Sequence, residues 1–209
     1  MTGIVLFGAG SPICADVVET CRRNGMQVAA AIRNVSGSVY VDASIPVVEA
    51  ADVTTEMTAL PFVLPMFSPQ NRRLALANAT ELGFHQPMRL VDCTAIVGGH
   101  CIIEEGVYIN TSTIVGSGST LERFVFCNRG ANIGHHCHIG SFASIGPGAV
   151  LAGSVTVGAG SQIGAGAIIL PKVRIGVATI IAPGAVVTRD VSDNGFAAGN
   201  PARILTSRP

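Results

Sequence analysis

The chain of 209 residues contains little charge and few aromatic side chains. Charged residues make up 12% and aromatic residues 5%, tryptophan is missing, and the 13 basic side chains balance the 13 acidic ones. Proteins that bind nucleic acid carry a basic surface. This balance therefore predicts no nucleic-acid partner.

Long hydrophobic runs are also missing. Mean hydropathy is +0.51, yet nowhere do about eighteen apolar residues follow one another, as a membrane-spanning helix requires. Met1 leads directly into a short apolar segment at 4–7, which leaves no room for a secretory signal peptide. We therefore expect no membrane association and a cytoplasmic location.

A six-residue repeat runs through more than half of the chain. Seventeen positions, all apolar, follow at intervals of six from Val91 to Val187. A small or β-branched residue lies two positions before each, with Arg89 as the exception. Six matches neither the period of a helix nor that of a strand, so it indicates a repeat architecture. Glycine directly follows eight of the seventeen, at 98, 116, 134, 140, 146, 158, 164 and 176.

This pattern predicts a parallel β-helix with three six-residue sides to each coil. Residues eighteen apart would then stack about 4.8 Å from one another. The aliphatic residue would point into the core, and the glycine after it would supply the positive φ that a tight corner demands. A hexapeptide solenoid that has no active site is the alternative.

Residues 1–88 follow a different pattern, with apolar strands expected at 4–7, 28–32 and 62–64. One helix is expected at 13–23. A second is expected to start at Pro69, with Ser68 as its cap, and to stop at Gly83. Strand, glycine turn, helix and strand describe half of a Rossmann-like domain. The predicted fold is therefore an α/β Rossmann-like domain over 1–88 followed by an all-β parallel β-helix over 89–209.

The glycine turn Gly8-Ala9-Gly10-Ser11 lacks part of the dinucleotide-binding fingerprint. Ile13 stands where the third glycine belongs, and Arg33-Asn34 stands where an acidic residue should follow the second strand. NAD binding is therefore not expected. Backbone N–H groups of the turn would suit a single phosphate or carboxylate, although the same residues also describe a simple tight turn.

The six cysteines include no Cys-x-x-Cys pair and no disulfide-like spacing. Cys127 occupies an inward register position, and Cys101 and Cys137 occupy the small inward positions. We interpret them as packing residues and expect no metal site.

Four of the five histidines lie in the repeat, and three of them are clustered in Gly134-His135-His136-Cys137-His138. Because Cys137 points inward, its neighbours should project outward. One coil away, His135 should stack between Ser117 and Gly153, and the glycine would leave space for a ligand beside the imidazole. A histidine that merely faces solvent is the alternative.

The segment from Asn128 to Leu205 resembles a bacterial sugar acetyltransferase family. This family includes sialic-acid O-acetyltransferases and N-acetyltransferases of UDP-linked 4-amino sugars. The most specific matches are GHHCHIGSF at 134–142 and GNPAR at 199–203. The resemblance implies a Rossmann-like substrate domain joined to a left-handed β-helix, assembly as a homotrimer, and acetyl-CoA as the acetyl donor.

The resemblance also implies roles for individual residues. His135 falls on the catalytic histidine and would act as general base in a direct transfer, which suits imidazole because its reference pKa is about 6.5. The coenzyme A groove would involve Gly164, Ala165 and Ala182. Lys172 and Arg203 are the candidates for its phosphates, together with Arg174 and Arg189, although each of these side chains is also compatible with a solvated surface.

Several positions depart from the family pattern. His136 stands where a carboxylate usually orients the base, so a water or a backbone carbonyl would have to replace it. Ser144 stands where a histidine helps to bind acetyl-CoA, and Pro12 replaces a histidine of the glycine turn. Arg33-Asn34 replaces paired aspartates, which suggests an anionic acceptor. The candidate acceptor-binding residues are Gly8, Gly10, Ser11, Arg33, Asn34 and Asn128.

Two other functions remain open. Carbonic anhydrases of the γ class share the β-helix and bind zinc through three histidines; His100 and His136 lie two coils apart as required, but Ser141 stands where the third ligand belongs. A non-catalytic binding subunit is also compatible with the departures at His136 and Ser144. The prediction is an acetyl-CoA-dependent acetyltransferase that acts on an amino or hydroxyl group of a sugar or sugar nucleotide in surface glycan biosynthesis.

Overall fold

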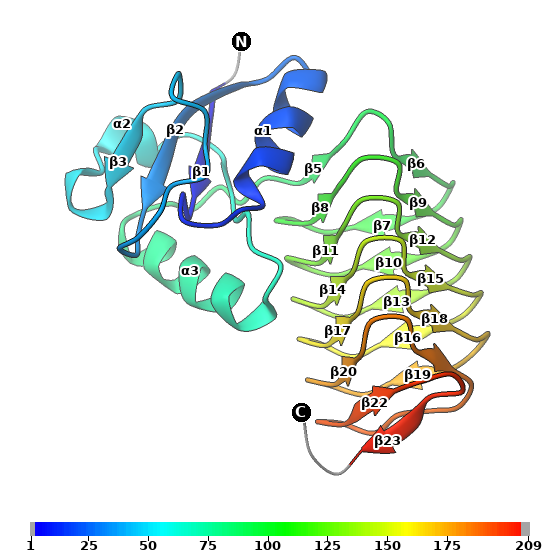
Figure 1. The fold of residues 1–209 in the computed structure, drawn as a ribbon. Helices are drawn as coiled ribbons and strands as arrows, with labels where there is room; N and C mark the ends of the chain where they lie inside the picture. The colour runs from blue at the N-terminus through cyan, green and yellow to red at the C-terminus, as the bar shows by residue number, and fades with distance from the viewer. Residues whose placement is uncertain (1–2, 206–209) are drawn as a thin grey trace. The chain divides into compact units, whose positions relative to one another are not determined.

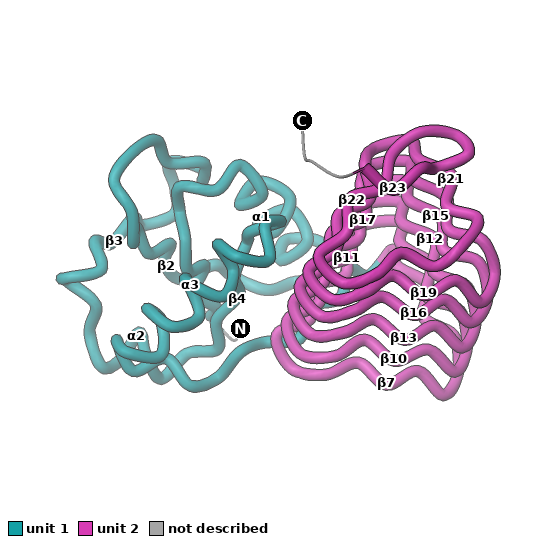
Figure 2. Tube along the Cα trace, turned by 90° about the horizontal axis from the view of Figure 1, so that it is seen from below, with its two compact units in different colours: residues 1–93 teal, residues 94–209 magenta. Residues whose placement is uncertain are grey.

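The computed structural model describes residues 3–205, so Met1, Thr2 and residues 206–209 lie outside the described part. The chain divides into two compact units, the first ending at Cys93 and the second beginning at Thr94 (Figure 2). The sequence pattern placed this boundary slightly earlier, between 88 and 89. Within the described residues, no helix has the length and apolar character needed to cross a membrane.

Unit 1 is built on a parallel four-stranded sheet with the order β3-β2-β1-β4 (Figure 1). Its strands are β1 (Gly3–Phe7), β2 (Gln27–Arg33), β3 (Val47–Glu49) and β4 (Phe62–Val63). The expected strands at 4–7, 28–32 and 62–64 are all present. Strand β3 was not expected, because it is only three residues long and none of its side chains is buried.

Two longer helices connect these strands. Helix α1 (Cys14–Arg23) follows the glycine turn, and α3 (Pro69–Glu81) follows β4. The Ser68 hydroxyl accepts a hydrogen bond from the backbone N–H of Asn71 at 3.3 Å, as the predicted cap requires. A short α2 (Thr55–Thr58) and a 3₁₀ turn, η1 (Ala50–Asp52), were not predicted, because their segment lacks helical periodicity.

A buried carboxylate fixes the last residues of unit 1 after β5 (Leu90–Val91). Asp92 is 1% exposed. It accepts hydrogen bonds from the Thr20 hydroxyl at 2.8 Å and from Nε of Arg23 at 2.9 Å. Because a buried carboxylate must be paired, these contacts tie the segment to α1.

Unit 2 is a stack of triangular coils (Figure 1). The strands on each of the three sides of the coils pair with those of neighbouring coils to form one sheet, here called a face. Face I consists of β6 (Ile96–Val97), β9 (Ile114–Val115), β12 (Asn132–Ile133), β15 (Val150–Leu151), β18 (Ile168–Ile169) and β21 (Val186–Val187). Face II consists of β7 (Ile102–Ile103), β10 (Thr120–Leu121), β13 (His138–Ile139), β16 (Thr156–Val157) and β19 (Arg174–Ile175). Face III contains β8 (Tyr108–Ile109), β11 (Phe126–Cys127), β14 (Ser144–Ile145), β17 (Gln162–Ile163), β20 (Ile180–Ile181), β22 (Phe196–Ala198) and β23 (Arg203–Leu205).

The register confirms the predicted eighteen-residue coil. Thr120 pairs with His138, and His138 pairs with Thr156. From Val115 to Val187, the residues at the six-residue register positions are buried, including Ile133 and Leu151. The last coil ends differently, because β22 pairs with β20 in parallel and with β23 antiparallel. The first four residues of the GNPAR segment form the turn between β22 and β23, and Arg203 begins β23.

The predicted reason for the corner glycines is wrong. None of the eight has a positive φ; that conformation occurs two residues later, at every sixth position from His100 to Gly184. The eight glycines are needed for close approach instead. A Cβ on Gly140, for example, would lie 2.7 Å from the backbone nitrogen of Ala159 in the next coil. Coils therefore touch backbone to backbone at these corners.

We expect Gly140→Ala to lower the free energy of unfolding by about 1–3 kcal/mol, because the added methyl group must push two coils apart. Chemical denaturation measures this. Gly99→Ala is the matched control, because a Cβ there meets nothing within 4 Å. Equal effects of the two substitutions would contradict the close-approach explanation.

Candidate active site

The exposed histidine pair lies at the corner between β12 and β13, here called the I–II corner. The Nδ1 atoms of His135 and His136 are 3.0 Å apart, within hydrogen-bond distance. The two rings are nearly perpendicular, with an interplanar angle of 81°. Both side chains are exposed, as predicted. The inward Cys137 between them and His138 is buried.

Glycines in neighbouring coils make room for both rings. A Cβ on Gly153 would lie 2.5 Å from Nε2 of His135, and a Cβ on Gly118 would lie 3.0 Å from Cδ2 of His136. The predicted neighbour of His135 is thus the correct one. The predicted gap for a ligand is not, because the imidazole of His135 itself fills the space over Gly153.

The hydrogen bond between the rings constrains where their protons lie. One Nδ1 must donate and the other must accept, so at most one of the two Nδ1 atoms carries a proton while the bond exists. If His135 donates, its Nε2 keeps a lone pair that can accept a proton from a substrate. The sequence suggested a water or a backbone carbonyl as the orienting partner of His135, whereas the structure provides the ring of His136.

His138 belongs to a different network. Its Nε2 lies 2.8 Å from Oε1 of Glu122. The other carboxylate oxygen of Glu122 accepts hydrogen bonds from the backbone N–H of Ser141 at 2.8 Å and from its hydroxyl at 2.7 Å. The hydroxyl bond is the main reason why the pKa of Glu122 is lowered; partial burial opposes it and the nearby His138 adds to it. This network joins two coils and does not involve the histidine pair.

The candidate cofactor residues lie at two different corners. Lys172 is exposed at the I–II corner, two coils from His136 in the same column. Gly164 and Ala182 stack on each other at the corner between faces III and I, here called the III–I corner, where a Cβ on Gly164 would lie 2.6 Å from the carbonyl carbon of Ala182. Ala165 is exposed beside them, and Arg203 is exposed in β23.

Two candidate ligand-binding residues in unit 2 are buried. Ser144 is 0% exposed in β14. Asn128 is 6% exposed and accepts a hydrogen bond from the amide of Asn110 at 3.2 Å. Neither side chain reaches the surface of the chain as described, so the structure does not bring them to the histidine pair. Their predicted roles stay predictions.

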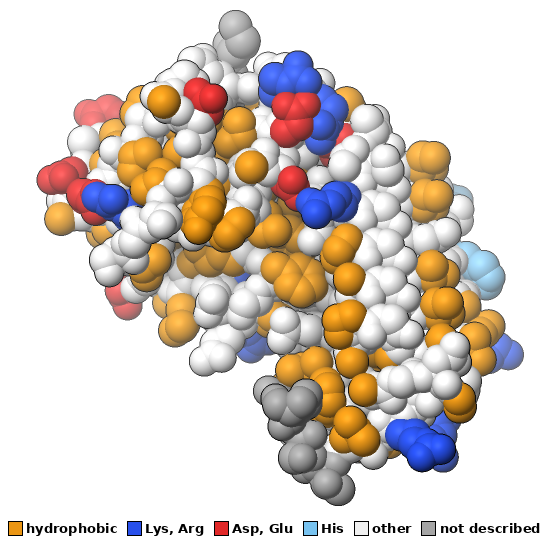
Figure 3. Space-filling view, in the orientation of Figure 1, with side chains coloured by type: hydrophobic (Ala, Val, Ile, Leu, Met, Phe, Trp, Pro, Cys, Tyr) orange, Lys and Arg blue, Asp and Glu red, His pale blue; other side chains and the backbone are white. Residues whose placement is uncertain are grey.

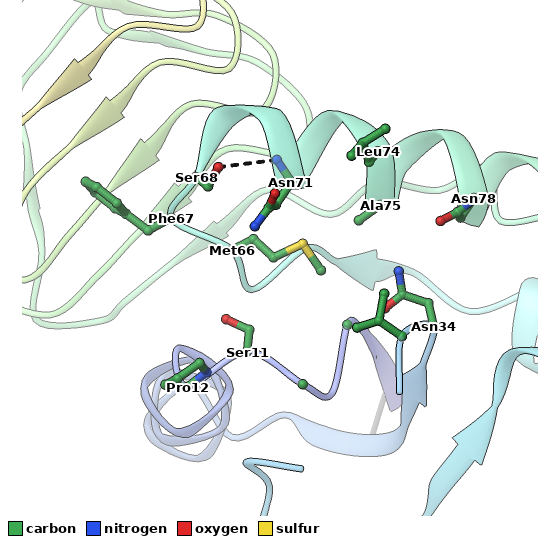
Figure 4. A pocket seen from close by; sticks show the side chains of 13 residues that line it. Ser11, Pro12, Asn34, Met66, Phe67, Ser68, Asn71, Leu74, Ala75 and Asn78 are labelled. Atoms are coloured by element: carbon green, nitrogen blue, oxygen red, sulfur yellow. Dashed lines mark hydrogen bonds between the residues drawn. The ribbon is translucent and has the colours of Figure 1, made fainter. Parts of the chain in front are cut away.

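Unit 1 contains a pocket of about 480 Å³ (Figure 4). It brings together four of the predicted acceptor residues, Gly8, Gly10, Ser11 and Asn34. Arg33 does not line it. Instead, the Arg33 guanidinium forms an ion pair with Glu49 of β3, with Nε at 2.8 Å from the carboxylate. The cation suggested for an anionic acceptor is therefore engaged elsewhere.

The remaining pocket residues were not predicted from the sequence. They come from the glycine turn, from the loop after β2, from the segment that joins β4 to α3, and from α3 itself. A sequence signal existed for the segment that joins β4 to α3, because the capped start of α3 follows an apolar strand and ligands bind at the carboxyl ends of parallel strands. These residues are Pro12, Val35, Met66, Phe67, Ser68, Asn71, Leu74, Ala75 and Asn78.

Most backbone donors of the glycine turn are already engaged within unit 1, although the sequence suggested that they bind a phosphate or carboxylate. The N–H groups of Gly8 and Ala9 donate to the carbonyl of Ile32. Those of Ser11 and Cys14 donate to carbonyls within the turn, and that of Ile13 donates to the Ser11 hydroxyl at 3.3 Å. Most donors of the turn thus serve to build it.

All six cysteines are free thiols; Cys127 and Cys137 are buried as predicted, whereas Cys101 is half-buried and Cys93 is exposed. Burial raises the pKa of the Cys14 thiol to about 11 and that of Cys21 to about 12, which makes both poor nucleophiles. Across residues 3–205, no group of three or more histidine, cysteine or acidic side chains is arranged to hold a metal ion.

No family model and no curated protein sequence matches the chain, but solved structures do. A mutant of perosamine N-acetyltransferase from Caulobacter crescentus, in complex with CoA and GDP-perosamine, has a TM-score of 0.86 at 27% identity, over 99% of this chain and 98% of that one. The acetyltransferase domain of PglB from Neisseria gonorrhoeae, in complex with acetyl coenzyme A, has a TM-score of 0.84 at 28% identity, over 97% and 98%. WeeI from Acinetobacter baumannii shares the fold, with a TM-score of 0.81 at 22% identity over 98% and 100%.

These matches identify the chain as an acyltransferase built on a β-helix of hexapeptide coils. The structural matches confirm the resemblance seen in the sequence, because the chain is similar over nearly its whole length to hexapeptide-repeat sugar acetyltransferases.

We expect Glu122→Gln to lower thermal stability at neutral pH and to have no effect in acid. A carboxylate whose folded pKa is lowered contributes stability above its unfolded pKa, about 4.3, and loses that contribution as the pH falls through the folded value. Melting temperatures of both proteins between about pH 7 and pH 3 measure this. The exposed Glu81→Gln is the control, and a gap that persists unchanged in acid would contradict the explanation.

Proposed function

We propose that the chain transfers the acetyl group of acetyl-CoA to an amino or hydroxyl group on the sugar of a nucleotide-linked acceptor, with His135 as the general base. The observation that carries this proposal is the hydrogen-bonded pair of exposed imidazoles at a β-helix corner. The Caulobacter crescentus structures, which contain CoA and GDP-perosamine, support the cosubstrate and the class of acceptor.

The chain's own contribution to the reaction is a positioned proton acceptor. With its Nδ1 proton donated to His136, His135 presents the lone pair of Nε2 to the acceptor. Nε2 takes the proton of the amine or hydroxyl as that group attacks the thioester carbonyl of acetyl-CoA; the C–S bond then breaks, and the departing coenzyme A thiolate takes a proton to leave as the thiol. The resulting imidazolium still donates to Nδ1 of His136, so the hydrogen bond persists through the step.

His136 orients the base but stabilises its charged form less than a carboxylate would. A neutral imidazole acceptor provides a hydrogen bond without the attraction between opposite charges. The His136 ring packs over Gly118, whose missing side chain leaves the space that the ring occupies beside His135. The pair therefore fixes the tautomer and the orientation of His135 with little added basicity.

The positions of the cofactor candidates support a homotrimer. His135 and Lys172 lie at the I–II corner, Gly164 and Ala182 at the III–I corner, and face I lies between the two corners. The two corners of one copy are therefore separated by the width of face I. A single cofactor would contact both kinds of corner where the I–II corner of one copy meets the III–I corner of another. The exposed side chains of face I suit such contact, since they form an apolar ladder of Ile96, Ile114, Val150 and Ile168 interrupted by Asn132 (Figure 3).

Unit 1 would hold the acceptor as a Rossmann-like domain. Its sheet is parallel, and its pocket lies where the first, second and fourth strands end.

A left-handed β-helix and a cytoplasmic location stay predictions.

The test of the proposed function is release of free thiol from acetyl-CoA in the presence of nucleotide-linked amino sugars, with GDP- and UDP-linked acceptors in the panel. We expect turnover with at least one acceptor, and a loss of about 100-fold or more in kcat for His135→Ala. The His138→Ala variant is the matched control and should keep its activity. Equal turnover by His135→Ala and the wild type would overturn the assignment.

Substitutions at His136 separate an orienting role from simple packing. We expect His136→Ala to lower kcat by about tenfold, because His135 loses the partner that fixes its tautomer. His136→Glu should restore or exceed wild-type kcat, since a carboxylate stabilises the imidazolium of His135.

The Michaelis constant for acetyl-CoA should stay the same in both variants, and melting temperatures report on their folding. If His136→Ala keeps full activity across the pH range, His136 does not orient the base.

A further inference from the structure

We propose that Ser119 is a positioning residue for acetyl transfer. Its hydroxyl is inserted into the backbone of the turn at 134–137 and sets the width of the turn at which the Nδ1 atoms of His135 and His136 meet. This inference rests on the proposed function, because it concerns the histidine pair to which that function assigns the base. Ser119 bonds to the backbone of the turn and acts on the two rings through it.

Many corners of the β-helix are closed by one direct backbone hydrogen bond. Each corner is a four-residue turn, and the N–H of its fourth residue donates to the carbonyl of its first. The distance is 3.1 Å from the nitrogen of Ala131 to the oxygen of Asn128, and 3.0 Å from that of Ala143 to that of Gly140. A bond of this kind draws the two ends of the turn together.

The turn that carries the histidine pair is closed through a side chain instead. The N–H of Cys137 donates to the Ser119 hydroxyl at 3.0 Å, and that hydroxyl donates to the carbonyl of Gly134 at 2.9 Å. Ser119 belongs to the preceding coil and is 0% exposed. Because a hydroxyl both accepts and donates, it satisfies both ends of the turn. Two bonds thus span the opening that a single bond closes elsewhere.

The same column of the β-helix shows what happens without a hydroxyl. The inward residue of this column is Val155 two coils after Ser119, and it carries no polar group. In the turn of the next coil, the N–H of Val173 donates directly to the carbonyl of Leu170 at 3.4 Å. We therefore expect the turn at 134–137 to close in the same way when the hydroxyl of Ser119 is removed.

The width of the turn matters because both imidazoles come from its two central residues. Their backbones are anchored on the neighbouring coils: the N–H of His136 donates to the carbonyl of Ser117 at 3.0 Å, and the carbonyl of His135 accepts from the N–H of Ser154 at 2.8 Å. The two Nδ1 atoms are 3.0 Å apart. Since a contact of about 3.6 Å is no longer a hydrogen bond, a shift of about 0.6 Å separates the pair.

Ser161 makes the same insertion at a corner that has no histidine. Its hydroxyl accepts from the N–H of Thr179 at 3.0 Å and donates to the carbonyl of Gly176 at 2.6 Å, and its side chain is also 0% exposed. The central residues of that turn are Val177 and Ala178. Ser161→Ala therefore removes the same two bonds at the same burial but leaves the histidine pair unchanged.

Steady-state kinetics of the full chain test the inference. We expect Ser119→Ala to lower kcat by about tenfold with an unchanged Michaelis constant for acetyl-CoA, because His135 loses its orienting partner. Ser161→Ala should keep the wild-type kcat, although both variants lose about 2–6 °C in melting temperature. Equal kcat values for the two variants would overturn the role of Ser119.

A double substitution shows whether Ser119 acts through the histidine pair. Ser119→Ala and His136→Ala remove the same contact between the rings, so we expect the double variant to lose about tenfold in kcat, as each single variant does. A loss that multiplies to about a hundredfold would mean that the two residues act independently, and it would overturn the proposal.

Conservative replacement provides a rescue. Cysteine occupies this column in the coils on either side of Ser119, where the thiols of Cys101 and Cys137 donate to the carbonyls of Gly116 and Ala152 at 3.3 and 3.2 Å. Ser119→Cys should therefore keep kcat well above that of Ser119→Ala. Equal loss in the two variants would contradict an effect of the inserted group.

Nitrogen NMR of the imidazoles reads the pair without any substrate. At a pH where both rings are neutral, we expect the wild type and Ser161→Ala to show His135 as the Nδ1–H tautomer alone, and Ser119→Ala to show a mixture of tautomers. Ser119→Val, which copies the residue at 155, is the second variant without a hydroxyl if Ser119→Ala folds poorly.

An imidazole spectrum that Ser119→Ala and Ser119→Val leave unchanged would overturn the inference. Failure of the proposed function has a different signature, because turnover would then be the same in His135→Ala and the wild type while the spectra still respond to Ser119.

Discussion

The close vertical stacking of the coils is the constraint on which the rest of unit 2 depends. Successive coils pair strand to strand in an eighteen-residue register, with hydrogen bonds such as the one from the backbone N–H of His138 to the carbonyl of Val155. At the corners, glycines allow backbones to approach to distances that no Cβ would tolerate. Because each coil is fixed on its neighbours, side chains at the corners acquire defined partners eighteen residues away.

The histidine pair is a direct product of this stacking. Gly153 and Gly118 belong to the coils on either side, and each provides the space that one imidazole occupies. Held in this way, the two rings meet through their Nδ1 atoms at 3.0 Å. Under the proposed function, the second imidazole would take the orienting role that a carboxylate has in the family pattern, without a negative charge beside the imidazolium.

The two units differ in the chemical groups that they present to a ligand. The pocket of unit 1 has neutral walls, and its unpaired Asn34 oxygen lies at the carboxyl ends of parallel strands. Unit 2 offers a proton acceptor and exposed cations at its corners. Under the proposed function, unit 1 would hold the acceptor while the β-helix carries out acetyl transfer.

Much of the fold could be predicted because periodicity is a strong signal. The six-residue register predicted the eighteen-residue coil, the buried positions and the residue that stacks on His135. The Ser68-Pro69 cap predicted the start of α3. The predicted reason for the corner glycines was wrong, because a close approach between residues eighteen positions apart cannot be recognised in the local sequence. The partner of His135 and the ion pair of Arg33 with Glu49 were also missed, because both depend on side-chain positions that spacing does not determine.

A crystal structure of the protein with coenzyme A tests the central claim most directly. The account predicts that the thiol of coenzyme A lies beside the I–II corner, close enough to His135 for an acceptor atom between them to be about 3 Å from Nε2. A coenzyme A molecule whose thiol lies away from His135 would contradict the assignment of this histidine pair as the site of acetyl transfer.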